Sequence, residues 1–356
     1  LPGGAVETMY VRHSTEQILN ITLIDSDRAM IEIDVTAPVG ETPQYRDLAL
    51  AVAASVRYSP PTSGGLVIAG GGPEAQPGSG PVVWKQQRAR GASASDFGGL
   101  GGMTIGPDDT IYVADGDKGV HVLDASGTLL YTVGNTEIGH IDDIALAPDG
   151  TLWVADSYAG RLYHLDAQGN MLVAYGEYGT EPGQFGDLSP TQVEVGADGS
   201  VYTVSQHEAD YRKWTSIIVL APDGTFVRDF PTNPDGDFIL PGDVQLAIGP
   251  GDVLHAADFW TQGVRTFAPD GAVLKSGLGG GVLMAVEDVA AAPDGAFYAA
   301  FMGTIYKFDS NGHLLAQAQI GADAGVMGMA VTGDGSLVIA AYLPSEDAAA
   351  VMRLRL

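Results

Sequence analysis

The chain has 356 residues, of which 44 are acidic and 17 basic, so its formal net charge is −27. Basic residues this few and scattered argue against a nucleic acid or an anionic membrane surface as partner, because both are bound by clustered lysines and arginines. The absence of cysteine excludes disulfides, thiolate metal sites and cysteine nucleophiles, whereas 45% hydrophobic residues suffice for a folded core.

The N-terminal region predicts a few strands and one helix. The segments ETMYVRH and ILNITLIDSDRAMIEIDVTA predict strands with an acidic turn between them. Residues 45–58, YRDLALAVAASVRY, are rich in Ala and Leu without Gly or Pro and predict a helix. These elements are too few for an independent core. We therefore expect residues 1–58 to be the C-terminal part of a small α+β domain.

Residues 59–81 are rich in Pro, Gly and Ser and predict a linker. The chain begins with Leu and shows no signal-peptide pattern, and no apolar run is long enough to cross a membrane. We expect a processed or partial product of a longer precursor, whose preceding segment has room for an anchor. The expected location is extracytoplasmic, at the cell surface or secreted, in a bacterium.

Two families of turns alternate through residues 82–356. The first family reads GPDD, APDG, GADG, GPGD, APDG and TGDG, with starts 40 to 53 residues apart. The second reads DASG, DAQG, APDG, APDG and DSNG. Short apolar strands flank every turn, so each period holds two hairpins, or four strands. This period and strand count are typical of a β-propeller blade.

The turn count also predicts how the ring closes. There are six turns of the first family and five of the second, so the last unit ends after its third strand, AVMRLRL. The missing fourth strand can come from residues 82–88, VVWKQQR, which precede the first unit. We therefore expect an all-β, six-bladed propeller of four-stranded blades, closed by an N-terminal and a C-terminal strand in one blade.

Residues 82–356 resemble NHL-repeat six-bladed propellers. The best copy is IDDIALAPDGTLWVADSYAGRLYHLDAQGNMLVAYGEYGTEPGQF, residues 141–185. Its DG-x-x-W/Y-V-A-D, R-x-x-x-x-D-x-x-G and closing P-G-Q-F pieces follow the family's pattern in order. The third unit departs from it, because VYTVSQHEADYRKWTSIIVL is longer and lacks VAD. The resemblance implies the fold, but that fold hosts lactonases, lyases, sensor domains and RNA binders alike.

The innermost strands begin at the loop face, opposite the Asp/Gly turns, beside the central channel. Six residues before each turn Asp lies one position per blade, namely Gly102, Asp143, Gln192, Asp288 and Gly328, with Asp243 or Gln245 in the fourth. Oxygen ligands at a channel mouth suit Ca²⁺. The candidate metal ligands are Asp143, Asp288, Asp243 and Gln192.

Gluconolactonase-like propellers place a catalytic divalent metal at this point with Glu, Asn and Asp, a set that the ring lacks. The alternative is that the acids cap strand starts and bind water. Asp142, Glu194 and Glu287 are expected to alternate away from the channel. Three converging imidazoles cannot be assembled, which argues against zinc.

The loop face also carries aromatic and imidazole side chains in its long loops. Exposed aromatic residues are common anchors of recognition surfaces. Phe185 of PGQF is expected to pack between blades instead. The candidate ligand- or partner-binding residues are Tyr211, Trp214, His207, Trp260, Phe259, Tyr178 and His140.

Three functions remain open from the sequence. The favoured one is a non-enzymatic exported binding or scaffold module, whose loop face recognises a protein or another ligand within a larger assembly. The second is a Ca²⁺-dependent hydrolase or lyase acting at the channel mouth, and the third a structural subunit of a surface layer or filament. An enzyme needs a metal or a positioned base beside a pocket, and the sequence offers two carboxylates and no convincing nucleophile.

Overall fold

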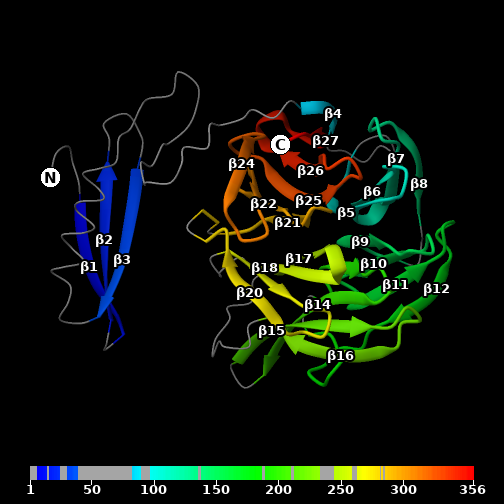
Figure 1. Cartoon of the computed structure of the whole chain (residues 1–356), viewed down its shortest axis with the longest axis horizontal. Coiled ribbons are helices and arrows are strands. Elements are labelled where there is room, and N and C mark those ends of the chain that lie inside the picture. The colour runs from blue at the N-terminus through cyan, green and yellow to red at the C-terminus, as the bar shows by residue number, and fades with distance from the viewer. Residues whose placement is uncertain are drawn as a thin grey trace. The chain divides into compact units, whose positions relative to one another are not determined.

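The computed structural model describes residues 6–13, 16–24, 30–38, 82–89, 97–134, 138–186, 189–209, 212–232, 244–258, 263–280, 282–283 and 285–356. The chain divides into two compact units, Leu1–Glu74 and Ala75–Leu356. The first unit contains an antiparallel sheet of β1 (Val6–His13), β2 (Glu16–Ile24) and β3 (Met30–Pro38), in that order (Figure 1). The predicted strands of this region are confirmed, whereas the predicted helix at 45–58 and the linker at 59–81 lie outside the described residues.

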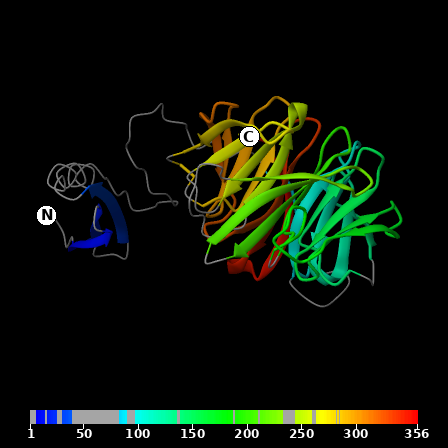
Figure 2. The ribbon, with the colours of Figure 1, turned by 90° about the horizontal axis from the view of Figure 1, so that it is seen from below.

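The second unit is a ring of six four-stranded antiparallel blades, which confirms the predicted fold class (Figures 1 and 2). Blades one to three contain β5 (Leu100–Ile105), β6 (Ile111–Asp115), β7 (Gly119–Leu123) and β8 (Leu129–Val133); β9 (Asp143–Leu146), β10 (Leu152–Asp156), β11 (Arg161–Leu165) and β12 (Met171–Tyr175); and β13 (Val193–Val195), β14 (Val201–Ala209), β15 (Arg212–Leu220) and β16 (Phe226–Pro231).

Blades four to six contain β17 (Val244–Gly249), β18 (Val253–Asp258), β19 (Val264–Phe267) and β20 (Val273–Leu278); β21 (Asp288–Ala291), β22 (Phe297–Phe301), β23 (Thr304–Phe308) and β24 (Leu314–Gln319); and β25 (Gly325–Val331), β26 (Leu337–Leu343), β27 (Ala348–Leu354) and β4 (Val82–Ala89). Short 3₁₀ turns are η1 (Gly116–Lys118), η2 (Pro250–Asp252) and η3 (Pro344–Glu346). In the described part of the chain, no helix is long and apolar enough to cross a membrane.

The hydrophobic core is divided among the junctions between blades. Each cluster of buried apolar side chains contains residues from two neighbouring blades, and together the clusters cover all six junctions. Between blades two and three, for example, Trp153 and Leu162 pack with Val201 and Ile218. A single blade cannot bury both of its faces, so the blades depend on one another and on closure of the ring.

The ring closes as the turn count predicts. Strand β4 pairs antiparallel with β27, from Ala348 opposite Ala89 to Leu354 opposite Val82. Figure 1 shows the cyan strand β4 beside the red strand β27. The innermost strand of this last blade, β25, also lies against β5 of the first blade. The two ends of the propeller sequence therefore share one sheet.

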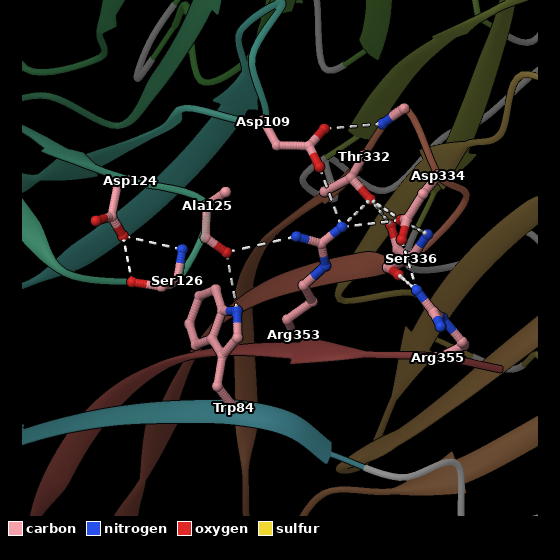
Figure 3. A network of polar contacts seen from close by, with 11 residues as sticks. Trp84, Asp109, Asp124, Ala125, Ser126, Thr332, Asp334, Ser336, Arg353 and Arg355 are labelled. Atoms are coloured by element: carbon pink, nitrogen blue, oxygen red, sulfur yellow. Dashed lines mark hydrogen bonds and ion pairs between the residues drawn. The ribbon is translucent and has the colours of Figure 1, made fainter.

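Arg353 on β27 joins the closing blade to the first blade (Figure 3). Its Nη2 donates to Asp334 Oδ1 at 2.9 Å, within its own blade, and to Asp109 Oδ2 at 3.1 Å, in the first turn of blade one. Its Nη1 reaches the carbonyl of Ala125 at 3.4 Å, which also accepts the indole N–H of Trp84 from β4. The guanidinium thus connects three turns, and only 9% of the residue is exposed.

The aspartates of the recurrent VAD pattern hold loops. Asp115 is fully buried and accepts the backbone N–H groups of Gly98 and Gly99, and His121 lies 2.7 Å from its other oxygen. Asp156 is its counterpart in the second blade and accepts the backbone N–H of Ala159 at 2.8 Å. These carboxylates tie the loop face to the strand ends.

Candidate active site

The side chains at the starts of the innermost strands link one blade to the next. Asp143 accepts the N–H of Ile144 in its own strand and the N–H of Val193 in the next blade, both at 2.8 Å. Gln192 repeats this contact one blade further, because its Oε1 accepts the N–H of Leu246 at 3.3 Å. In both cases the donor is the residue that follows the corresponding position of the next blade.

The same rule holds in the fifth blade. Asp288 accepts the N–H of Val289 at 2.8 Å and hydrogen-bonds to the backbone of Met329, which follows Gly328. Because Gln192 contacts the residue after Gln245, the position in the fourth blade belongs to Gln245. Asp243, the other candidate there, lies outside the described residues. The predicted alternative, in which the acids cap strand starts, thus describes a role that Asp143 and Asp288 do perform.

The two glycines of this ring mark close contacts. A Cβ atom on Gly102 would lie 1.6 Å from Asp143 Oδ1, so the absent side chain makes room for that carboxylate. A Cβ atom on Gly328 would lie 2.7 Å from the carbonyl oxygen of Gly101 in the neighbouring blade. The small residues let the innermost strands approach one another, and the carboxylate of Asp143 is packed against the first blade.

Burial disfavours the ionised form of the ring carboxylates. Burial raises the pKa of Asp143 to about 7, against the opposing effect of its backbone hydrogen bonds, and the charge of Asp142 raises it further. Burial also raises the pKa of Asp288 well above its usual range, and the charge of Asp143 adds to this rise. The charge of Asp143 in blade two thus reaches Asp288 in blade five.

Glu194 is a third channel carboxyl, and the expectation that it alternates away from the channel is wrong. Burial raises its pKa well above the usual range, and the charges of Asp143 and Asp288 raise it further, so Glu194 lies within electrostatic reach of both acids. It lies two residues after Gln192, and side chains two apart share a face of a strand. Counting by two from Gln192 would have found it. Its carboxylate has no hydrogen-bond partner among the described residues, in contrast to Asp143.

The other two neighbouring acids behave as predicted. Asp142 accepts the N–H of Ser157 at 2.7 Å, and Glu287 accepts the N–H groups of Met302 and Val326 at 2.9 and 3.0 Å. The two carboxylates thus accept backbone N–H groups of loops and of the neighbouring strand β25. These hydrogen bonds give Asp142 and Glu287 a structural role. Glu194 is the channel carboxyl without such a role.

The channel donors suit calcium in kind, because calcium prefers carboxylate and amide oxygens. Their spacing does not suit a metal ion, because across the described ranges no three His, Asp or Glu side chains lie close enough to hold one. Asp143 and Asp288 also accept hydrogen bonds from backbone N–H groups, and each carboxylate does so from two strands. The predicted set of Asp143, Asp288, Gln192 and Asp243 is therefore not assembled as a metal cage by the described residues.

The aromatic residues predicted to bind a partner have mixed placements. Tyr178 is 73% exposed on the loop face, and its strand partner Phe185 is fully buried, as expected. Trp214 stacks on the buried ring of His207, with centroids 5.1 Å apart. Tyr211, Phe259 and Trp260 lie outside the described residues.

The remaining candidate, His140, is half-buried beside an exposed tyrosine. Its ring meets the edge of Tyr158 at 4.8 Å, and its Nε2 lies 3.6 Å from Asp142. Tyr158 is 75% exposed and was not among the predicted residues. Tyr158 follows β10 and Tyr178 follows β12, so two exposed tyrosines mark the loop side of the second blade.

The comparisons with known proteins agree with this architecture. No protein-family model and no curated protein matches the chain. Among solved structures, a gluconolactonase from Xanthomonas campestris is 17% identical with a TM-score of 0.53, covering 79% of this chain and 98% of that one. A putative gluconolactonase is 15% identical with a TM-score of 0.55, covering 79% and 97%. Regucalcin from Agrobacterium tumefaciens, described as a calcium-binding protein, is 15% identical with a TM-score of 0.54, covering 75% and 93%.

These identities show a shared fold. The propeller implied by the resemblance to NHL repeats is confirmed, and the structures found similar are gluconolactonase- and regucalcin-type propellers. The chain carries a six-bladed β-propeller with the architecture of those proteins.

Proposed function

We propose that the protein is an enzyme that acts at the mouth of the central channel, as a hydrolase or lyase of a small lactone or ester. The observation that carries this proposal is Glu194, a channel carboxyl without a hydrogen-bond partner in the described part of the chain, whose pKa is raised by burial and by two nearby acids. Perturbed carboxyl groups beside a channel are candidates for acid–base catalysis. The fold shared with the gluconolactonase supports the choice of substrate class.

In this proposal Glu194 exchanges a proton with the substrate. A carboxyl whose pKa is raised holds its proton to a higher pH than an ordinary glutamate. It can therefore protonate the oxygen that leaves as water adds to the carbonyl carbon of a lactone or ester. Asp143 and Asp288 lie within electrostatic reach of Glu194, and their backbone hydrogen bonds hold them in place. They act as positioning residues, and Glu194 is the group that touches the substrate.

Calcium is the proposed cofactor to test first, because the channel side chains in the described part of the chain offer oxygen donors. A bound cation would stabilise the ionised carboxylates and thereby the folded state. No step assigned to Glu194 depends on it. Melting curves with and without calcium measure this stabilisation separately from activity. If calcium does not shift the melting temperature, the cofactor is removed from the proposal.

The experiment compares Glu194→Gln with Glu177→Gln on a panel of lactones and p-nitrophenyl esters. Glu177 is exposed on the same loop face and serves as the matched control. We expect Glu194→Gln to lower kcat about 100-fold or more, the usual share of one general acid, with Glu177→Gln unchanged. Equal activity of both variants, or no turnover of any panel member by the parent protein, would reject the enzyme.

A second candidate is the binding module favoured by the sequence. Two tyrosines about three-quarters exposed, Tyr158 and Tyr178, support a recognition surface on the loop side of the second blade. Its partner would be a protein of a larger assembly, and the proposed location remains extracytoplasmic in a bacterium. Affinity capture from the native cells, with Tyr178→Ala as comparison, tests this; a partner retained equally by the variant would count against this surface. Assembly of the purified protein into filaments or sheets, seen by electron microscopy, would instead favour the structural subunit.

A further inference from the structure

An aspartate, a histidine and a threonine are joined in series by hydrogen bonds in the first blade. His121 on β7 lies between the other two. Its Nε2 is 2.7 Å from Oδ2 of Asp115, at the end of β6, and its Nδ1 is 2.9 Å from Oγ1 of Thr132 on β8. His121 and Thr132 are direct partners across the sheet. Carboxylate, imidazole and hydroxyl therefore stand in the order that activates an alcohol as a nucleophile.

The carboxylate determines which ring nitrogen carries the proton. Burial acts to raise the pKa of Asp115, but hydrogen bonds from His121 and from two backbone N–H groups outweigh it, and the pKa is lowered. An ionised carboxylate only accepts hydrogen bonds, so in the neutral imidazole Nε2 carries the proton and donates to Asp115. Nδ1 is then an acceptor, and the Thr132 hydroxyl donates to it. The hydroxyl proton thus lies on a base that can take it.

The series leads from the interior of the blade to its surface. Asp115 is fully buried and His121 is 2% exposed, whereas Thr132 is exposed on β8, the outermost strand of the first blade (Figure 1). Phe97 packs against the imidazole, with ring centroids 5.7 Å apart, and helps to hold it in place. The base is therefore fixed inside the blade while the hydroxyl oxygen faces solvent.

The fold does not require the imidazole and the hydroxyl. In the second blade the positions of His121 and Thr132 are occupied by Tyr163 and Ala174, which are partners in the same register. The VAD aspartate is present there as Asp156, and it still accepts a backbone N–H of its loop. A blade can thus use this aspartate to hold its loop without a histidine and a threonine beside it.

We propose that Thr132 is a self-acylation site, which takes an acyl group from a small activated ester or thioester. Thr132 Oγ1 attacks the carbonyl carbon of the donor, and the hydroxyl proton passes to His121 Nδ1. The bond from the carbonyl carbon to the leaving oxygen or sulfur then breaks, and the leaving atom keeps the electron pair and takes the proton from His121. The products are an ester on Thr132 and a free phenol or thiol. Asp115 is a positioning residue, which holds the imidazole and stabilises its charged form.

The donor class follows from the place of the hydroxyl. Thr132 lies on an outer strand, where an activated donor with a weakly basic leaving group reacts without a dedicated set of oxyanion donors. Leu130 and Tyr131, each about half exposed on the same strand, offer apolar surface to such a donor. The site does not depend on the function proposed for the channel mouth, because β8 is the outermost and not the innermost strand of its blade.

The test counts acetyl groups on the chain by mass spectrometry and locates them by peptide fragmentation. The probes are p-nitrophenyl acetate and S-acetyl-N-acetylcysteamine near neutral pH. Thr128 is the internal control, because it is exposed in the same hairpin and its hydroxyl lies 3.0 Å from that of Ser126 instead of an imidazole. We expect acetylation of Thr132 to be about 100-fold faster than that of Thr128, the effect of one general base. A faster reaction with the thioester would assign a thioester donor and a faster reaction with the aryl ester an oxygen ester; both support the site.

Variants separate base catalysis from a structural role of the histidine. His121→Gln should lower the ratio of Thr132 to Thr128 acetylation to near one, and Thr132→Ser should keep the modification at this position. His164→Gln is the matched control, because it removes another largely buried histidine that contacts a threonine, Thr151, and should leave the ratio unchanged. The proposal is overturned if Thr132 reacts no faster than Thr128 in the parent protein, or if His164→Gln lowers the ratio as much as His121→Gln. If His121→Gln does not fold, the ratio in the parent protein still decides.

Discussion

Replacing Arg353 with methionine should weaken the junction that closes the ring. The methionine keeps most of the apolar stem and removes the guanidinium, which donates to Asp109, Thr332, Asp334 and the Ala125 carbonyl. Breaking a fully buried ion pair costs about 3–5 kcal/mol. Here the side chains of Asp109 and Asp334 are 26% and 42% exposed and can be rehydrated. We therefore expect a loss of about 2–3 kcal/mol in the free energy of unfolding, below the fully buried case.

Urea denaturation followed by circular dichroism measures this loss, and thermal melting should show a fall of about 5 °C or more. Arg355→Met is the matched control, because Arg355 is 63% exposed and contacts Asp334 and Ser336 in its own blade. An exposed pair of this kind is worth less than about 1 kcal/mol. If Arg353→Met were no less stable than Arg355→Met, the guanidinium would not hold the closing blade to the first one.

Three further outcomes follow from the ring. Gly102→Ala should cost about 2 kcal/mol or more, because its Cβ would displace the carboxylate of Asp143, whereas Gly99→Ala has open space and should cost less than about 0.5 kcal/mol in the same denaturation assay. Deleting residues 351–356 removes most of the partner of β4 and should abolish cooperative unfolding in calorimetry; an unchanged transition would refute closure by that strand. Glu194→Gln should be more stable than the parent at pH 8 and similar near pH 4. A carboxyl with a raised pKa loses stability as pH rises from about 4.5 through its folded value, so a pH-independent difference would contradict the assigned burial.

The blade number and the closing strand could be predicted because the turns are local. An Asp followed by Gly specifies a tight hairpin within four residues, and in the structure Gly150 has φ 85° and donates to Ala147, as such a turn requires. Counting these turns then fixes the strand order, including the pairing of β4 with β27. Counting the turns requires no knowledge of contacts between distant residues.

The sites were harder to predict because they depend on contacts between blades. The space left by the absent side chain of Gly102 is occupied by the carboxylate of Asp143, 41 positions later. Glu194 was assigned to the wrong face by an error of strand parity.

The fold accounts for two of the channel carboxyl groups and not for the third. Asp143 and Asp288 connect neighbouring blades through backbone N–H groups, so their burial is accounted for by the ring itself. Glu194 makes no such bond in the described part of the chain, and its raised pKa means that its charge destabilises the fold at neutral pH. A partly exposed channel carboxyl with a raised pKa and no structural contact is a candidate for a functional residue. Because of this contrast, more than the acidic composition of the channel, the proposed catalytic group is Glu194 and not Asp143 or Asp288.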